Sequence, residues 1–192
     1  LTNYSLLQVT SANLTVSGVG LNTNNGTITT VTGGTQSYTG NVSNPGTITG
    51  VGLLTFSGTL TSAGTLNMGA GGATVAGAAD FSGGTVDFNG GGAATLTVSG
   101  NLTFTAGSTV SNCTVIDTII FTGVAAQTFT TGGKTFGSVT VNKGGGSVAL
   151  GGARQEAAPT LVEQTAVMTA TGNCGLGQAA PMAVINADQH WP

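Results

Sequence analysis

Charge is what this sequence has least of. Only 5% of its 192 residues are charged, three Lys and Arg against six Asp and Glu, with a single His. Ordinary soluble proteins carry roughly 25% charged residues. With a net charge of −3, the chain offers no positive field to attract a phosphate backbone. We therefore expect no nucleic-acid binding.

Long apolar runs are also missing. Local apolar clusters such as Val51-Gly52-Leu53-Leu54 are short, whereas a membrane-spanning helix needs about 18 to 20 residues. The 34 glycines follow no three-residue period and are joined by only four prolines, which excludes a collagen-like helix. At 39% hydrophobic residues the chain is too apolar for charge-driven disorder. We expect a folded domain with a continuous core and no membrane insertion.

Groups that titrate or attack a substrate are few. The single His is His190, near the end of the chain, and the repeat region contains the acids Asp80, Asp87 and Asp117. Catalysis needs such groups in clusters. The glycine clusters at 90–92 and 144–146 are not followed by the Asp that calcium-binding β-roll repeats require. The sequence therefore predicts a protein that is not an enzyme, with no catalytic residues, no metal site and no cofactor.

The two cysteines, Cys113 and Cys174, lie far apart and fit no zinc-binding spacing. They can form one disulfide that closes a long loop. The alternative is two separate buried thiols, since unpaired Cys is among the most buried residue types. Both interpretations stay open at this point.

What the sequence does contain is a short repeat. The stretch Asn25-Gly26-Thr27-Ile28-Thr29 returns as Pro45-Gly46-Thr47-Ile48-Thr49, and in weaker copies at 64–67 and 84–87. The glycines that mark the four copies stand at positions 26, 46, 64 and 84, so their spacing is nearly even. A unit this short cannot bury its own apolar face, so it must stack on its neighbours.

Short strands at close spacing fit a β-sandwich or a β-solenoid. The repeat favours the solenoid, because stacked coils place one pattern repeatedly in the same environment. We predict an all-β fold, a right-handed parallel β-solenoid (β-helix) of seven or eight coils, each of about 20 residues, with an antiparallel β-sandwich as the alternative. The predicted inward ladder consists of Ile28, Ile48, Leu66 and Val86, and the predicted outward ladder of Thr27, Thr47, Thr65 and Thr85.

The predicted repeat domain spans residues 1–152, with 1–12 as an N-terminal cap or first coil. Strands are predicted at 13–17, 27–31, 46–50, 53–56, 59–61, 64–68, 73–76, 85–88, 94–98, 101–105, 113–122, 127–131, 138–141 and 147–150. From 153 to 192 the Gly-Thr rhythm stops. We interpret this segment, with a short helix near 153–158 and strand-like sequence at 161–171 and 182–185, as a C-terminal cap or an arm that docks on another copy. The alternative is a loose tail.

Threonine pairs give the chain a candidate ligand face. Regular Thr-x-Thr pairs on a flat solenoid face can order water as in ice. The middle repeats read Thr65-Leu66-Asn67 and Thr85-Val86-Asp87 and would interrupt such an array. The candidate residues are Thr27, Thr29, Thr47, Thr49, Thr95, Thr97, Thr128 and Thr130.

The runs 94–110 and 121–143, rich in Gly, Thr and Asn, resemble the repeats of filamentous-haemagglutinin-like and autotransporter-passenger β-solenoids on bacterial surfaces. The resemblance implies a secreted, extracellular or cell-surface molecule, elongated and non-enzymatic. It implies a role in adhesion or in building a filament, sheath or surface layer. The expected partners are other copies of the chain, with surface glycans as the second class.

Overall fold

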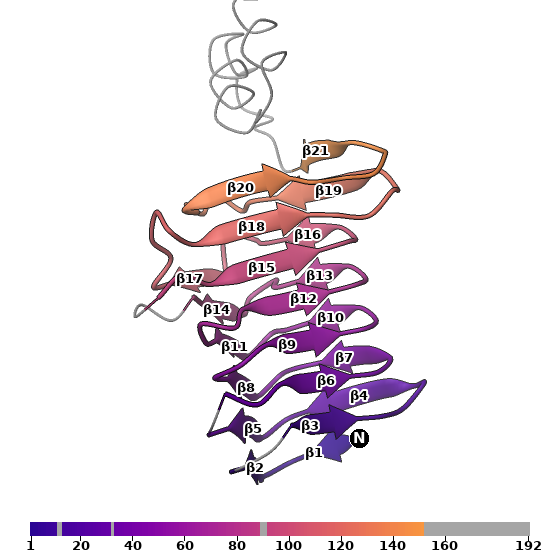
Figure 1. The fold of residues 1–192 in the computed structure, drawn as a ribbon, viewed down its shortest axis with the longest axis vertical. Helices are drawn as coiled ribbons and strands as arrows, with labels where there is room; N and C mark the ends of the chain where they lie inside the picture. Colours follow the sequence, from indigo (N-terminus) through magenta and orange to yellow (C-terminus); the bar gives the residue numbers. More distant parts are fainter. Residues whose placement is uncertain (11–12, 32, 89–91, 152–192) are drawn as a thin grey trace, which may run out of the picture. The chain divides into compact units, whose positions relative to one another are not determined.

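The structure is a computed structural model that describes residues 1–10, 13–31, 33–88 and 92–151. These residues fall within one compact unit, Leu1–Gly151. All regular elements among them are β-strands, and the strands form three sheets that run the length of the unit (Figure 1). The predicted C-terminal segment, 153–192, lies outside the described residues.

Each sheet collects one strand from each successive turn of the chain, which we call a coil. Sheet A consists of β1 (Thr2–Asn3), β4 (Leu21–Asn24), β7 (Asn41–Ser43), β10 (Leu60–Thr61), β13 (Ala79–Asp80), β16 (Leu102–Thr103), β19 (Gln127–Thr130) and β21 (Val148–Gly151). Sheet B consists of β2 (Leu6–Val9), β5 (Thr27–Thr30), β8 (Thr47–Gly50), β11 (Thr65–Met68), β14 (Thr85–Asp87) and β17 (Thr109–Ser111). Sheet C consists of β3 (Leu14–Val16), β6 (Gln36–Tyr38), β9 (Leu54–Phe56), β12 (Ala73–Val75), β15 (Thr95–Val98), β18 (Thr118–Phe121) and β20 (Ser138–Val141).

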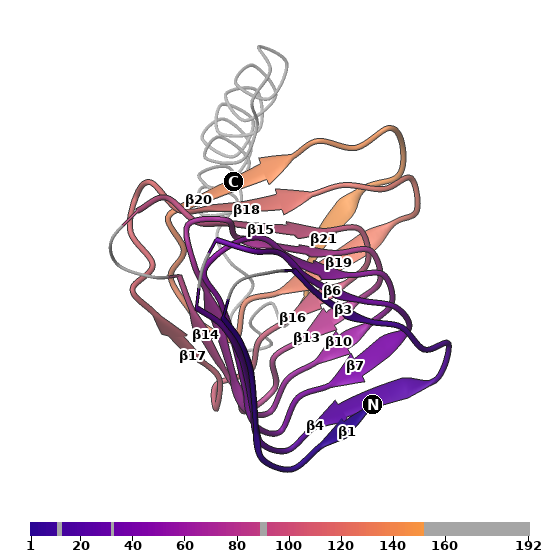
Figure 2. The same cartoon turned by 60° about the horizontal axis from the view of Figure 1, so that its bottom comes forward.

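The strand pairs establish a parallel β-solenoid of about seven turns. Each strand pairs in parallel with the strand one coil earlier, as in the register Ile28↔Ile48, so the prediction is confirmed and the antiparallel sandwich is excluded. In Figure 2, with the N-terminal end toward the reader, the chain runs clockwise as it recedes, which makes the coil right-handed.

The predicted inward ladder is confirmed in sheet B. Ile28, Ile48, Leu66 and Val86 are in register and at most 1% exposed. The ladder continues to Leu7 at one end of the sheet and Val110 at the other. Stacking apolar side chains in this way removes their surface from water, which is the main favourable contribution to folding.

One corner of the coil is held by asparagines rather than by apolar side chains. Asn3 donates to Oδ1 of Asn24 at 2.8 Å, Asn24 donates to Oδ1 of Asn44 at 2.8 Å, and Asn44 donates to Oγ of Ser62 at 3.0 Å. The Nδ2 atoms of Asn24 and Asn44 also donate to the main-chain carbonyls of Thr47 and Thr65. This asparagine ladder links the first four coils side chain to side chain.

Farther along, the same corner changes its chemistry. Phe81 follows β13 and Phe104 follows β16, in the place that Asn44 and Ser62 take after β7 and β10. The rings of Phe81 and Phe104 stack with centroids 5.3 Å apart, and the Phe136 ring packs against Phe104 at a tilt, with centroids 5.0 Å apart. The corner column is therefore polar in the first four coils and aromatic in the next two.

Glycine is required where one corner presses on the corner beneath it. A Cβ atom at Gly46 would lie 2.1 Å from the carbonyl oxygen of Gly26, and one at Gly64 would lie 1.9 Å from that of Gly46. Real Cβ atoms do not approach this closely. The repeated glycine that marks each copy in the sequence thus sets the close stacking of the corners.

The structure differs from the strand predictions in two respects, one predicted strand that is shorter and several strands that were not predicted. Cys113–Thr122 is not one strand, because a turn at 112–117 closes on the buried carboxylate of Asp117 and the strand begins only at Thr118. Strands also form where none was predicted, namely β1, β2, β4, β6, β7, β13 and β17. Residues 1–10 contribute β1 and β2, which pair with β4 and β5 as part of the first coil.

Candidate functional site

The outer faces of the solenoid carry columns of short hydroxyl side chains. On sheet C one column runs through Thr15, Ser37, Thr55, Thr74, Thr97, Ile120 and Thr140. On sheet A another runs through Thr2, Thr23, Ser43, Thr61, Asp80, Thr103 and Thr130. These columns arise because strand alternation turns every second residue outward and the coils stack in register.

Sheet B differs because it carries two complete outward columns. The first consists of Leu6, Thr27, Thr47, Thr65, Thr85 and Thr109, and the second of Gln8, Thr29, Thr49, Asn67, Asp87 and Ser111. The predicted outward threonine ladder is thus in place. Neighbouring side chains are spaced by about 4.8 Å across strands and about 6.6 Å along a strand. This double column is the most regular polar surface on the described solenoid.

The eight threonines predicted as one ligand face lie on three different faces. Thr27, Thr29, Thr47 and Thr49 share sheet B, on the neighbouring strands β5 and β8. Thr95 and Thr97 lie on β15 of sheet C, and Thr128 and Thr130 on β19 of sheet A. Only the sheet B threonines form a two-by-two array.

The double column loses its threonines where the sequence indicated. Asn67 and Asp87 follow Thr49 in the second column, and Asp87 accepts a hydrogen bond from Nδ2 of Asn112 at 2.8 Å. The first column remains threonine through these coils. The face therefore changes from hydroxyl pairs to a mixed hydroxyl, amide and carboxylate surface from β11 onward.

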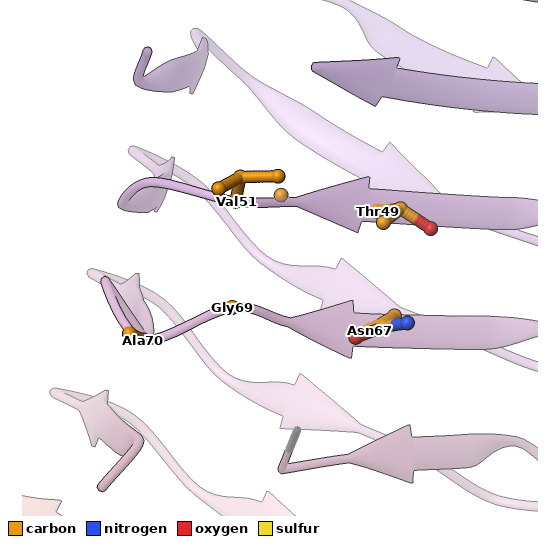
Figure 3. A pocket seen from close by; sticks show the side chains of 6 residues that line it. Thr49, Val51, Asn67, Gly69 and Ala70 are labelled. Carbon is orange, nitrogen blue, oxygen red and sulfur yellow. The ribbon is translucent and has the colours of Figure 1, made fainter. Parts of the chain in front are cut away.

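A small open hollow of about 220 Å³ lies at the end of the strands β8 and β11. Figure 3 shows Thr49 and Asn67 on the two neighbouring strands and Val51, Gly69 and Ala70 in the turns that follow. The hollow is lined by neutral groups, a hydroxyl, an amide and small apolar side chains.

The most strongly held polar side chain in the later coils is that of Asp117, only 1% exposed. Its carboxylate accepts hydrogen bonds from the amides of Ala94 at 2.7 Å and Thr114 at 2.6 Å, and from the Thr114 hydroxyl at 2.9 Å. Burial alone raises the pKa of this carboxyl, but these hydrogen bonds outweigh it and leave the pKa below its ordinary value. Asp117 joins its own turn to the previous coil.

The sequence contained a signal for this turn that the strand prediction overlooked. Thr114 and Asp117 form a Thr-x-x-Asp spacing, and short polar side chains at such spacing often bond to nearby main-chain groups in turns. An interpretation that gave this spacing more weight than the apolar residues Val115 and Ile116 would have placed the turn correctly.

Cys113 lies next to this turn and is half-buried. Burial, together with the negative charge of Asp117, raises the pKa of its thiol, although a bond from the main chain of Gly137 acts the other way. The thiol is therefore held in its less reactive, protonated form. Cys174, its predicted disulfide partner, lies outside the described residues, so the disulfide stays a prediction.

Within the parts of the chain that the structure describes, no group of three or more His, Cys, Asp and Glu side chains is arranged to hold a metal ion. In the same residues, no helix has the length and hydropathy to cross a membrane. Buried side-chain nitrogen and oxygen atoms of the described coils all have hydrogen-bond partners. The polar interior is thus fully used in holding the coils together.

Comparisons with models of protein families, with curated proteins and with solved structures find no match to this chain.

Proposed function

We propose that the protein is a non-enzymatic extracellular scaffold, of the kind formed by filamentous-haemagglutinin-like surface proteins, that associates with other copies into a filament, sheath or surface layer. The observation that carries the proposal is the set of hydroxyl columns on all three outer faces. Threonine and serine side chains can lie against a second copy without the repulsion that stacked like charges would cause.

The placement of the polar side chains supports a function of the outer faces rather than of an enclosed binding pocket. Buried polar side chains such as Asn24 and Asp117 are committed to bonds within and between coils. The hollow beside Thr49 is open and small, whereas ligand pockets are commonly concave spaces of about 300 to 1,000 Å³. Extended faces therefore offer more contact area than any enclosed site found on the described coils.

The test is the association state of the purified full chain. Sedimentation velocity across a hundredfold concentration range, with electron microscopy of the same samples, is expected to show ordered particles that grow with concentration. Monomers alone at the highest concentration would contradict the proposal.

A second candidate, ice binding, is favoured by the two-by-two array of Thr27, Thr29, Thr47 and Thr49. These side chains lie in register on one face and are uncharged. Thermal hysteresis of the full chain tests it, with Thr49→Lys as the variant and Thr55→Lys on sheet C as the matched control. Ice binding through sheet B requires that only Thr49→Lys abolishes the activity, and absence of activity in the unchanged protein ends this candidate.

A further inference from the structure

Sheet B ends one coil earlier than its neighbours. Its last strand is β17, while sheet C continues to β20 and sheet A to β19 and β21, as Figure 1 shows above the β17 label. The chain passes from β16 to β18 by way of β17 through the segment 104–117, but it passes from β19 to β20 directly, through the shorter segment 131–137. The later coil therefore lacks a sheet B strand.

The path of residues 131–137 shows where this shortcut runs. A Cβ atom at Gly132 would lie 2.5 Å from the main chain of Thr105, and Nζ of Lys134 donates to the carbonyl of Ala106 at 2.9 Å. At the other end, a Cβ atom at Gly137 would lie 1.9 Å from the carbonyl oxygen of Thr114. The segment 131–137 thus rests on the coil on either side of β17, and none of the described residues adds a strand to the outer edge of β17.

One edge of β17 is hydrogen-bonded to β14, and the other edge has no strand beside it among the described residues. The amide of Thr109 donates to the carbonyl of Gly84 at 2.8 Å, and the amide of Phe88 donates to the carbonyl of Ser111 at 3.0 Å. Residues 109 and 111 therefore face β14. In a parallel sheet the residue between them faces the opposite side, so the amide and carbonyl of Val110 point toward the level where the described part of sheet B has no strand.

We call the space beside the edge of β17 that faces away from β14 the β17 notch. The Phe136 ring packs at a tilt against Phe104 and Phe129, and Lys134 lies at the start of the notch, where it donates to the carbonyl of Ala106. The notch has the height of one strand, about 4.8 Å. Val110 forms its floor and, as the last member of its ladder, is half-buried like Leu7 at the other end, whereas the members between them are buried.

We propose that the β17 notch binds an extended strand from a second copy of this chain, supplied by residues 161–171. This inference rests on the proposed self-association and specifies which surface of one copy contacts which segment of the other. An extended segment can add to an exposed sheet edge through main-chain hydrogen bonds, with its alternate side chains continuing the inward and outward ladders.

Two observations select this occupant. The end of another solenoid cannot reach β17, because β19, β20 and β21 extend beyond it on the other two sheets; a detached strand can. The described chain up to Gly151 is wound into coils, so within the given sequence the candidate source of a detached strand is the segment 152–192. Within it, 161–171 is rich in Val and Thr and carries one charge, Glu163, opposite in sign to Lys134 at the notch.

The test measures hydrogen exchange of the full chain in peptides spanning 108–114, at concentrations below and above the onset of association. We expect the Val110 amide to become protected only as association sets in. Protection at all concentrations would mean that the same chain fills the notch, and absence of protection would mean that nothing does; either result overturns the inference.

The matched variants are Val110→Pro and Val110→Ala. Both remove the valine side chain from the ladder, but only proline removes the amide hydrogen that faces the notch. Association of Val110→Pro is expected to be at least about tenfold weaker than that of Val110→Ala, with both variants retaining the β-sheet circular dichroism signal. Equal association of the two variants, in a chain that still self-associates, would refute the notch while leaving the proposed function intact.

Discussion

At the scale of single residues, Asn24 shows how one side chain holds three coils together. It accepts a hydrogen bond from Asn3, donates one to Asn44 and donates another to the carbonyl of Thr47. The side chain is 2% exposed, so water cannot replace these partners. Loss of the amide leaves buried donors and acceptors on both neighbouring coils without partners.

Asn24→Ala is therefore expected to lower the free energy of unfolding by about 2 to 3 kcal/mol, the cost of leaving buried polar groups unpaired. Asn25→Ala is the control, because Asn25 is exposed on the same corner, and it is expected to change stability by less than about 0.5 kcal/mol. Denaturant unfolding of both variants gives the comparison. Equal stabilities would show that the asparagine ladder contributes little.

The buried carboxylate of Asp117 leads to a second prediction at this scale, which concerns how the stability of the protein depends on pH. Its pKa is lowered in the folded state, so the ionised carboxylate stabilises the fold above the pKa of the unfolded chain. That contribution is lost as the pH falls below about 4 and through the folded-state pKa. We expect Asp117→Asn to be less stable than the unchanged protein at pH 7 and the difference to shrink at pH 2 to 3.

Thermal unfolding of the protein and this variant from pH 7 to pH 2 provides the measurement. Asp80→Asn is the matched control, since Asp80 is partly exposed and bonds to Ser82 within its own turn. A stability difference between Asp117→Asn and the unchanged protein that is the same at both ends of the pH range would contradict the prediction.

The residues that could be predicted from the sequence are those whose role repeats. Ile28, Ile48, Leu66 and Val86 were identified because each stands in the same place of a recurring pattern. Asn24 was not, because asparagine in a Gly- and Thr-rich sequence indicates an exposed turn. Its burial depends on having another asparagine one coil away, and pairing of this kind between coils is not visible in a local window.

At the scale of elements, the corner glycines set the coil spacing. A Cβ atom at Gly64 would collide with the main chain of Pro45 and Gly46, and neither can move without shifting a whole coil. Gly64→Ala is expected to destabilise the protein by about 2 kcal/mol or more.

Gly20→Ala is the matched control for this substitution, because a Cβ atom at Gly20 meets no atom within 4 Å. It is expected to be neutral or slightly stabilising, since alanine lowers the entropy of the unfolded chain. Thermal unfolding of the two variants checks the pair, and similar losses in both would show that glycine matters here for a reason other than close stacking.

Element boundaries were harder to predict than the repeat itself. The coil length followed from the spacing of the glycines, but the short strands β4, β6 and β7 lack a run of β-branched residues. They form because the neighbouring coils offer paired edges on both sides. The candidate face was likewise only partly predictable, since the position of a Thr-x-Thr pair within its coil decides which sheet it joins.

At the scale of the whole solenoid, the composition of the outer faces predicts that the proposed association is independent of charge. The hydroxyl columns contain few ionisable groups, so screening by salt has little to act on. We expect the sedimentation coefficient at a fixed protein concentration to change little between 20 mM and 500 mM sodium chloride. A large fall in association with salt would show that the few charged residues, rather than the neutral faces, hold the copies together.

The change of the corner column from asparagine to phenylalanine gives the two ends of the solenoid different responses to temperature. Apolar burial weakens on cooling, whereas the hydrogen-bonded amides do not rely on it. The coils around Phe81, Phe104 and Phe136 should therefore loosen first in the cold, and those around Asn24 and Asn44 should keep their slow amide exchange. We therefore expect the described coils to differ in cold sensitivity even though they share one repeated pattern.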